Sequence, residues 1–555
     1  MSDIPAVQED SAADRVSGKG RFVFADKKQF VFVFVFFLAY LIIGILSYKD
    51  YGISWDEQSH RQIGMVSAKY AAAILLPGFQ TPELAALPPL ADYSAKHYGV
   101  IFDLPMYALD LLFDYSGAMP AAYYMRHLCA FLLFYLSVFF FFLIVKNRFQ
   151  SWPLGLAACL FLILSPRIFA DSFYGKDSVF LSFFIICIYF FIRYLNRRNI
   201  RNALLFGLAT ALLVDQRITG IFIPCLAVFL TGTDIIQEER PWQNLSKKLL
   251  PVIVYLVSFF LLMVLFWPYL WADPVGNLLD AFTIMKKYAV FSYDIFYWGE
   301  FIKSTEVPWH YIPAWMAITT PLIYLFFFFL GLAVIIRRVI QQGITLYSND
   351  GEKQDILFML LFFAPLAAVI ILNSALYDGW RHMYFIYAPF LLIAMSGFAR
   401  LLDLMKETVS GRGRGAVAGI FLAAVMISGI ITTSYSMIRH HPFQNVYFNI
   451  LAGNNPGVNF ELDYWGLSFR QGLEYIVKND KRPTIKLSAN VIPPVINNAI
   501  LLKRSDLNRL RLTEINHADY FLTNYRWHPQ PYNLHNEVFT ISVNDSKIMS
   551  VFRLR

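Results

Sequence analysis

The sequence predicts an α-helical membrane protein with many crossings, followed by a small α/β domain outside the bilayer. Of its 555 residues, 57% are hydrophobic, 17% are aromatic and only 15% are charged. A helix needs about 20 apolar residues to cross a bilayer, and windows of this kind recur up to residue 434. From residue 435 the composition is mixed, as in a soluble domain.

The apolar segments predict about eleven crossings in a transmembrane domain that covers residues 30–434. The expected spans are 30–47, 121–145, 151–165, 178–193, 203–214, 218–232, 249–267, 310–336, 355–373, 383–399 and 416–434. Every second connection is rich in Lys and Arg, so the positive-inside rule places these connections and the N-terminal segment 1–29 in the cytoplasm. An odd number of crossings then places residues 435–555 on the opposite side.

Two parts outside the crossings have patterns of their own. The long first outer loop, 48–120, contains an acidic and apolar stretch, 102–113, that is too short to cross and is expected to be an interfacial amphipathic helix. In the C-terminal part, residues 469–479 are helix-like. Strand-like stretches follow at 484–489, 519–523, 539–543 and 548–554, so an α/β domain is expected, which could recognise the acceptor or cap the site.

Composition also excludes several function classes. The net charge is +8, but most cations flank apolar segments and set topology, so we expect no nucleic-acid partner. The four cysteines lie inside apolar runs without motif spacing and are expected to be core residues rather than metal ligands or disulfides. The polar start leads into a long apolar run without a cleavage pattern, which indicates a retained first anchor.

Each outer connection combines a cation with a carboxylate. The pair Asp56–Glu57 follows the first apolar segment, and later outer loops carry similar pairs. Isolated charges at membrane depth are costly, so we expect these groups to meet in one polar pocket at the outer face. The groups are Asp56, Glu57, His60, Arg61, Lys96, His97, Asp103, Arg167, Asp171, Lys176, Asp177, Asp215, Arg217, Tyr377, Asp378, Arg381 and His382.

The side chains in such a pocket favour chemistry on a phosphorylated lipid. Arg and Lys suit a phosphate or pyrophosphate, and a carboxylate suits removal of a proton from an acceptor hydroxyl or amine. Trp and Tyr side chains stack on sugar rings, although an interfacial aromatic belt explains any one of them as well. Structural ion pairs are likewise an alternative for single cations such as Lys176 or Arg381. The phosphate candidates are Arg167, Lys176, Arg217, Arg381 and His382.

Three motifs occur in a fixed order along residues 30–400. They are Trp55-Asp-Glu-Gln-Ser-His60, Ser165-Pro-Arg167 followed by Asp171 and Lys176-Asp177, and Arg381-His-Met-Tyr384. With these motifs the chain resembles the C-type (GT-C) glycosyltransferase superfamily. Within it, the chain is similar to the protein O-mannosyltransferase-like group (glycosyltransferase family 39-like) and to bacterial relatives that include the lipid A aminoarabinose transferases.

The resemblance implies a GT-C fold with an active site at the extracytoplasmic surface, and inverting transfer of a sugar from a polyprenyl-phosphate donor. It implies that Asp56 is the catalytic base and that Glu57 orients the acceptor or adjusts the charge of Asp56. Lys96 and His97 lie where relatives hold the donor, but the proline-rich donor motif of the family is altered here to Lys96-His-Tyr-Gly-Val-Ile-Phe-Asp-Leu-Pro105.

The remaining expectations concern acceptor, metal, location and alternatives. The acceptor is a glycan, a lipid or a protein, and the expected residues for acceptor or sugar binding are His60, Asp171, Asp177, Tyr377 and Trp380. No metal is required, although Asp56, Asp171 and Asp177 could converge on a divalent ion. A bacterial inner membrane with a periplasmic active site and C-terminal domain is expected. A transporter of lipid-linked sugars and a non-catalytic scaffold remain alternatives.

Overall fold

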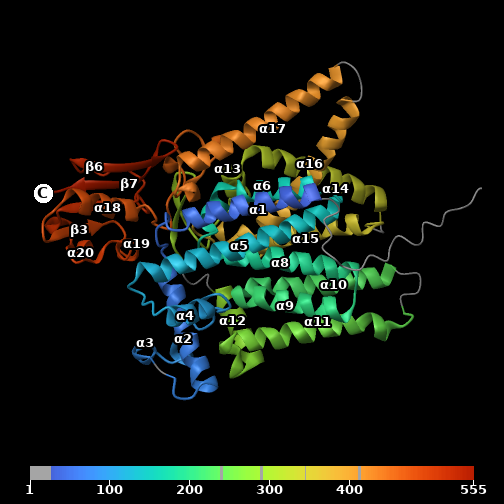
Figure 1. The fold of residues 1–555 in the computed structure, drawn as a ribbon, viewed down its shortest axis with the longest axis horizontal. Helices are drawn as coiled ribbons and strands as arrows, with labels where there is room; N and C mark the ends of the chain where they lie inside the picture. The colour runs from blue at the N-terminus through green and yellow to red at the C-terminus, as the bar shows by residue number, and fades with distance from the viewer. Residues whose placement is uncertain (1–26, 80, 238–241, 288–291, 344–345, 410–413) are drawn as a thin grey trace, which may run out of the picture.

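The computed structural model describes residues 27–79, 81–237, 242–287, 292–343, 346–409 and 414–555. The expected N-terminal segment 1–29 therefore lies almost wholly outside the described residues. Long helices run side by side as a bundle, and the C-terminal domain sits at one end of it (Figure 1). The fold is that of a multi-pass α-helical membrane protein with a small C-terminal α/β domain.

Each expected span coincides with helix. The bundle helices are α1 (Lys27–Ser47), α5 (Pro120–Phe149), α6 (Trp152–Ile163), α8 (Asp177–Asn196), α9 (Ile200–Gln216), α10 (Phe222–Gln237), α11 (Leu245–Phe266), α14 (Leu322–Gln342), α15 (Asp350–Ile371), α16 (Tyr387–Val409) and α17 (Arg414–Arg439). Within the described ranges, eight helical stretches are long and apolar enough to cross a membrane. Fewer helices meet this length and hydropathy criterion than the eleven or so crossings expected. Two of the expected crossings, α6 and α9, have only 12 and 17 residues.

The expected span 310–336 was wrong as a single helix. It is divided into α13 (Tyr311–Thr319) and α14, with Thr320 in an extended conformation between them. Pro321 follows Thr320, and a proline disfavours the helical conformation of the residue before it. After this break α14 packs closely against α16, because Gly331 and Gly397 have no side chains at the contact. A Cβ at Gly331 would lie 1.9 Å from the carbonyl oxygen of Ile393.

The first outer loop contains α2 (Glu57–Leu75), α3 (Pro82–Ala85) and α4 (Asp103–Leu112). Helix α2 runs across the end of the bundle rather than along it (Figure 1). Helix α4 matches the predicted amphipathic helix: Asp103 and Asp110 are buried on one side, whereas Leu111 and Leu112 are exposed. Helix α12 (Pro274–Lys287) and the hairpin of β1 (Asp294–Tyr297) and β2 (Glu300–Lys303) were not predicted.

The C-terminal domain has a five-stranded sheet of order β4-β3-β5-β7-β6. Strand β3 is parallel to β4 and β5, and the other pairings are antiparallel. Its elements are α18 (Phe469–Asn479), β3 (Ile485–Ala489), α19 (Pro493–Ala499), α20 (Arg504–Leu507), β4 (Leu510–Leu512), β5 (Tyr520–Thr523), β6 (Glu537–Val543) and β7 (Ser546–Arg553). The predicted helix and four predicted strands are present, whereas α19, α20 and β4 had no sequence signal.

Two asparagines of α19 fasten the C-terminal domain to the first loop. Asn498 accepts a hydrogen bond from the backbone N–H of Ile53 at 3.0 Å and donates to the carbonyl of Ile53 at 3.1 Å. Asn497 donates to the carbonyl of Ser54 at 2.9 Å. These bonds act on the residues directly before Asp56, so the C-terminal domain helps to position the acidic pair.

Candidate active site

Asp56 is held where the first outer loop turns into α2. The backbone N–H of Trp55 donates to the carbonyl of Trp465 at 3.2 Å, which ties this turn to the C-terminal part of the chain. The carboxylate of Asp56 accepts a hydrogen bond from Lys176 Nζ at 2.7 Å, and Arg381 Nη1 lies 3.7 Å away. Burial opposes ionisation of Asp56, but the charges of Lys176 and Arg381 hold its pKa well below the usual range.

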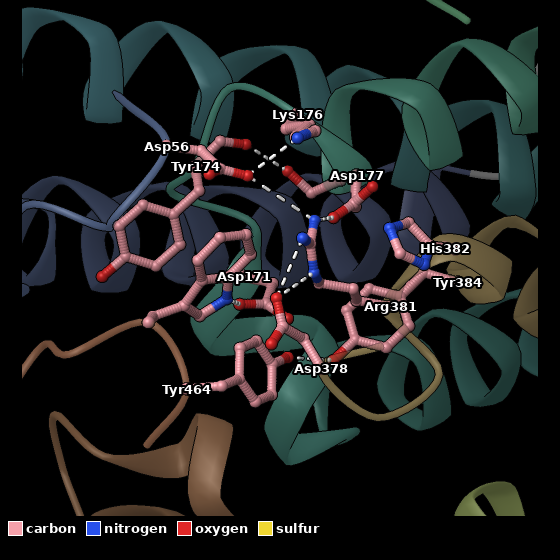
Figure 2. A network of polar contacts seen from close by, with 12 residues as sticks. Asp56, Asp171, Tyr174, Lys176, Asp177, Asp378, Arg381, His382, Tyr384 and Tyr464 are labelled. Atoms are coloured by element: carbon pink, nitrogen blue, oxygen red, sulfur yellow. Dashed lines mark hydrogen bonds and ion pairs between the residues drawn. The ribbon is translucent and has the colours of Figure 1, made fainter. Parts of the chain in front are cut away.

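Arg381 is the centre of the polar network shown in Figure 2. Its guanidinium is only 2% exposed and contacts carboxylates from three different loops. Nη1 lies 3.1 Å from Asp177, and Nε donates to Asp378 at 3.0 Å. The turn that aims Arg381 inward has positive φ angles at Asp378 (58°) and Gly379 (66°), a conformation that Asp and Gly tolerate better than most residues.

Lys176 and Asp177 begin α8, and Arg217 follows the end of α9. Arg217 Nη2 lies 2.6 Å from Asp177, and Arg217 Nη1 donates to the carbonyl of His382 at 3.3 Å. Asp177 therefore bridges Arg217 and Arg381. Asp56, Asp177 and Asp378 each have a cationic partner, as buried charges require.

A cavity of about 570 Å³ adjoins the network. Its polar lining includes His60, His97, Lys176, Arg217 and His382. Its apolar part is lined by side chains of α10, α12, α15 and the residues near them, including Ile218, Phe222, Phe282, Pro365, Ala368, Val369, Leu372, Met383 and Phe385. The lining thus combines many apolar side chains with the cations Lys176 and Arg217, and this combination suits an amphiphile with an anionic head group.

A second, much smaller pocket of about 20 Å³ lies on the other side of Lys176 and is lined by Asp56, Glu57, Asp171 and Trp465. Asp171 accepts a hydrogen bond from Trp465 Nε1 at 3.2 Å, and burial raises the pKa of Asp171 to about 7. Lys176 lines both this pocket and the large cavity. A group bound in the large cavity would therefore meet Asp56 across Lys176.

Glu57 has a structural task in the observed arrangement. One carboxylate oxygen accepts the backbone N–H of Ser54 at 2.6 Å, and the other lies 2.9 Å from His127 Nε2. Glu57 lines the small pocket but both of its oxygens are engaged. It therefore holds the turn before Asp56 in shape.

The other predicted residues are distributed around the network. His60 Nδ1 lies 3.2 Å from Asp103 Oδ2, and His97 Nε2 lies 2.9 Å from Asp280 Oδ2. Both histidines line the large cavity. Tyr377 packs against His382 with a ring distance of 4.6 Å and also lines that cavity.

Three of the residues predicted to bind the donor, the acceptor or the sugar do not join the network or line either cavity. Lys96 Nζ donates to the carbonyl of Ala91 at 2.6 Å. Arg167 donates to the carbonyl of Tyr447 at 3.0 Å and lies over the ring of Phe448, where it connects the bundle to the C-terminal part. The Trp380 indole donates to Thr319 at 2.9 Å. Lys96 and Trp380 thus donate to partners outside the network, and Arg167 does so through Nε, while its buried Nη2 has no hydrogen-bond partner among the described residues.

Asp378 was among the charged groups expected to meet in the pocket, and it does lie in the network. Trp465 and Arg526 were not among the expected site residues. Trp465 carries the ring beneath the guanidinium of Arg381, at 4.6 Å. Arg526 reaches in from the C-terminal domain, and its Nη2 lies 2.7 Å from Asp378. No local pattern distinguishes Arg526 from other arginines of that domain.

A metal site is not formed by the side chains that the structure describes. Among the described residues, no group of three or more His, Cys, Asp or Glu side chains is placed to hold a metal ion. Asp56 and Asp177 are each paired with cations instead. The expectation that no metal is required stays a prediction.

Comparison with known families gives a match over part of the chain. Residues 125–271 match the family model described as dolichyl-phosphate-mannose-protein mannosyltransferase. The matched segment contains Arg167, Lys176, Asp177 and Arg217 of the predicted site. The resemblance to the C-type glycosyltransferases is thereby confirmed for this part of the chain. No curated protein matches the sequence significantly.

Among solved structures, the oligosaccharyltransferase of Archaeoglobus fulgidus, tethered with an acceptor peptide, is similar with a TM-score of 0.47 and 12% identity. The similarity covers 87% of this chain but only 64% of the archaeal chain, less than two thirds of its length. ArnT from Cupriavidus metallidurans, solved in the apo state and bound to undecaprenyl phosphate, is similar with a TM-score of 0.45 and 10% identity. That similarity covers 94% of this chain and 98% of ArnT.

The raised pKa of Asp171 predicts a pH-dependent stability. The pKa is about 7 in the folded state and about 4 in an unfolded chain, so between these values the unfolded state binds fewer protons. The free energy of unfolding therefore falls as the pH rises from about 4 to about 7. Asp171→Asn should reduce the fall of the melting temperature between pH 5 and pH 8 by a few degrees Celsius.

The melting temperature of the purified protein in detergent would be measured at both pH values. Asp92→Asn, at an exposed carboxylate, should leave the pH dependence as in the wild type. An unchanged pH dependence in Asp171→Asn would show that Asp171 is ionised in the folded protein across this range.

Proposed function

We propose that this chain, a relative of the C-type membrane glycosyltransferases, transfers a sugar from a polyprenyl-phosphate donor to an extracytoplasmic acceptor with inversion. The observation that carries this proposal is a largely apolar cavity lined by the cations Lys176 and Arg217, of which Lys176 also binds Asp56. Such a cavity fits a long isoprenoid chain with a phosphate head group. The aspartate beside it fits the role of a general base.

The charges of the network favour a donor with one phosphate. Four cations face three carboxylates, so the network carries one net positive charge; the members are Lys176, Arg217, Arg381, Arg526, Asp56, Asp177 and Asp378. A polyprenyl-phosphate sugar is a phosphodiester with one negative charge. Lys176, Arg217 and His382 line the cavity and would contact this group, whereas Arg381 would hold the carboxylates in register.

In the proposed reaction Asp56 accepts the proton of the acceptor hydroxyl or amine. The acceptor atom then forms a bond to the anomeric carbon of the sugar. The bond between this carbon and the phosphate oxygen breaks, and its electron pair leaves with the lipid phosphate. Lys176 and Arg217 stabilise the charge that develops on that phosphate, which is the largest catalytic contribution expected of such cations.

Lys176 links donor binding to the basicity of Asp56. In the observed arrangement Lys176 Nζ binds Asp56 at 2.7 Å, and a carboxylate so paired is a weak base. A phosphate in the large cavity would draw Lys176 away from Asp56 and raise the pKa of the carboxylate. The base would then become effective only when the donor is bound.

For the acceptor side, we propose that Asp171 and Tyr377 contact the acceptor or the sugar, with His60 at the edge of the site. Asp177 is paired with Arg217 and Arg381, and the Trp380 indole donates to Thr319. In this proposal both residues therefore position the other groups. We place the site at the periplasmic face of a bacterial inner membrane, following the charge pattern of the loops.

Because cationic side chains can neutralise the leaving phosphate, we propose that no resident metal takes part. Transfer measured with purified protein in nanodiscs should proceed at the same rate, within about twofold, before and after treatment with EDTA. A rate that collapses with EDTA and returns with Mg²⁺ or Mn²⁺ would contradict this part of the proposal.

Asp56→Asn should lower the transfer rate about 100-fold or more, because it removes the base but keeps the shape of the side chain. The product would be followed by mass spectrometry of envelope lipids, glycans and proteins from cells with the wild type, the variant or no copy. Asp50→Asn, at an exposed carboxylate in the same loop, should leave the product unchanged.

If cells with Asp56→Asn retain the product that the null strain loses, the base assignment fails. The transporter interpretation would then take its place, because the protein would matter for the product without chemistry at Asp56.

Lys176→Met should weaken the binding of undecaprenyl phosphate by about tenfold or more, because a charge-assisted hydrogen bond to the phosphate is lost. Affinity would be measured by microscale thermophoresis of the protein in nanodiscs. Lys96→Met is the comparison variant. The Lys96 amine donates a hydrogen bond to the carbonyl of Ala91, so its loss should leave the affinity unchanged. Equal affinities in the wild type and Lys176→Met would remove Lys176 from the phosphate site.

A further inference from the structure

A third cavity, of about 300 Å³, lies between the C-terminal domain and the loop that leads into it. It shares none of its lining residues with the large cavity beneath Lys176. The side chains that matter in it are Phe296 of β1, Val458 and Glu461 of the loop, and Arg526 and Trp527 of the C-terminal domain. The proposed transfer reaction uses none of this space.

Two residues that line this cavity each have one buried polar atom without a partner. Glu461 is only 7% exposed, and its Oε1 has no hydrogen-bond partner within the described part of the chain. The same is true of Nε of Arg526. A buried polar atom without a partner costs about 1–3 kcal/mol, so native proteins rarely leave one unless a ligand or water completes it.

Two further charged groups of the cavity have partners of their own. Asp463 accepts hydrogen bonds from the backbone N–H groups of Leu467 at 3.1 Å and Ser468 at 2.9 Å. Lys547 is paired with Glu537 at 2.6 Å. The unused acceptor on Glu461 and the unused donor on Arg526 therefore stand out within this lining.

Aromatic side chains flank these two atoms. Trp527 is 41% exposed and is held at a positive φ of 60°, a conformation that is costly for a bulky residue. Its indole N–H donates to the carbonyl of Asp294 at 3.0 Å, which fixes the ring beside the hairpin. A fixed, partly exposed indole next to a carboxylate and a guanidinium is a suitable platform for a sugar ring.

Arg526, which lines the cavity, contacts the residue that precedes Asp56. The guanidinium of Arg526 lies 5.0 Å from the ring of Trp55 and 4.7 Å from the ring of Trp527. Trp55 directly precedes Asp56 in the chain. Arg526 also pairs with Asp378, which holds Arg381 in the catalytic network. A molecule that contacts Arg526 in this cavity is thus close to the proposed base.

We propose that this cavity binds a hydroxyl-rich glycan portion of the acceptor, with Glu461 Oε1 accepting from one sugar hydroxyl and Arg526 Nε donating to another. A hydroxyl both donates and accepts, so a single sugar can satisfy the two atoms, whereas an acyl chain would satisfy neither. The inference rests on the proposed function in that it names the acceptor class of that site.

The test measures glycan binding directly. Purified, fluorescently labelled protein in nanodiscs is applied to an array of oligosaccharides from bacterial cell envelopes. The wild type should bind at least one glycan of the array. Glu461→Leu, which removes the acceptor atom, and Val458→Trp, which fills the cavity from an exposed position, should each weaken that binding tenfold or more.

Matched variants outside the cavity should bind as the wild type does. They are Glu474→Leu on α18, whose carboxylate is paired with Arg470, and Ile515→Trp at an exposed position of the same domain. The inference is overturned if the wild type binds no glycan of the array, or if Glu461→Leu and Val458→Trp, both folded by melting temperature, bind as tightly as the wild type.

Asp56→Asn separates this inference from the proposed function. It should bind the glycan normally and fail to transfer a sugar to it. If Asp56→Asn binds and also transfers normally, the proposed base is wrong while the glycan site stands. If it binds normally and fails to transfer, but the two cavity variants also bind normally, the glycan site is wrong while the proposed function stands.

Discussion

The arrangement of the site depends on one buried guanidinium. Arg381 is almost fully removed from solvent and is satisfied only because Asp177 of α8, Asp378 of its own turn and, at a longer distance, Asp56 of the first loop converge on it. A buried charge of this kind tolerates no missing partner. The positions of three loops that are far apart in sequence are thereby tied to one another, and the carboxylate of Asp56 is placed beside Lys176.

The C-terminal domain takes part in the same arrangement. Asn497 and Asn498 hold the backbone before Asp56, Trp465 lies beneath Arg381, and Arg526 shares Asp378 with Arg381. The domain is therefore more than a lid over the bundle. Arg526 both lines the third cavity and pairs with Asp378 of the network. In the function that we propose, Arg526 therefore links the acceptor site to the catalytic network.

Part of the fold and part of the candidate site could be predicted from the sequence. Helix α18 and the strands β3, β5, β6 and β7 were expected, because their patterns are local. The division of the span 310–336 at Thr320 was missed, although Pro321 was a visible signal for it. Lys176, Arg217 and Arg381 were chosen for their charge and do meet. The same criterion also selected Lys96 and Arg167, of which Lys96 Nζ and Arg167 Nε donate to backbone carbonyls outside the network.

The sequence by itself determined the class of the protein and the identity of its charged outer loops, because membrane helices and the cost of charge beside a bilayer leave a direct mark on composition. Only the tertiary structure decided which charges share a partner, that Glu57 supports the backbone before Asp56, and that Arg526 belongs to the network. The physical reason is that pairing between buried charges depends on distances of a few ångströms between segments hundreds of residues apart, and no local pattern encodes them.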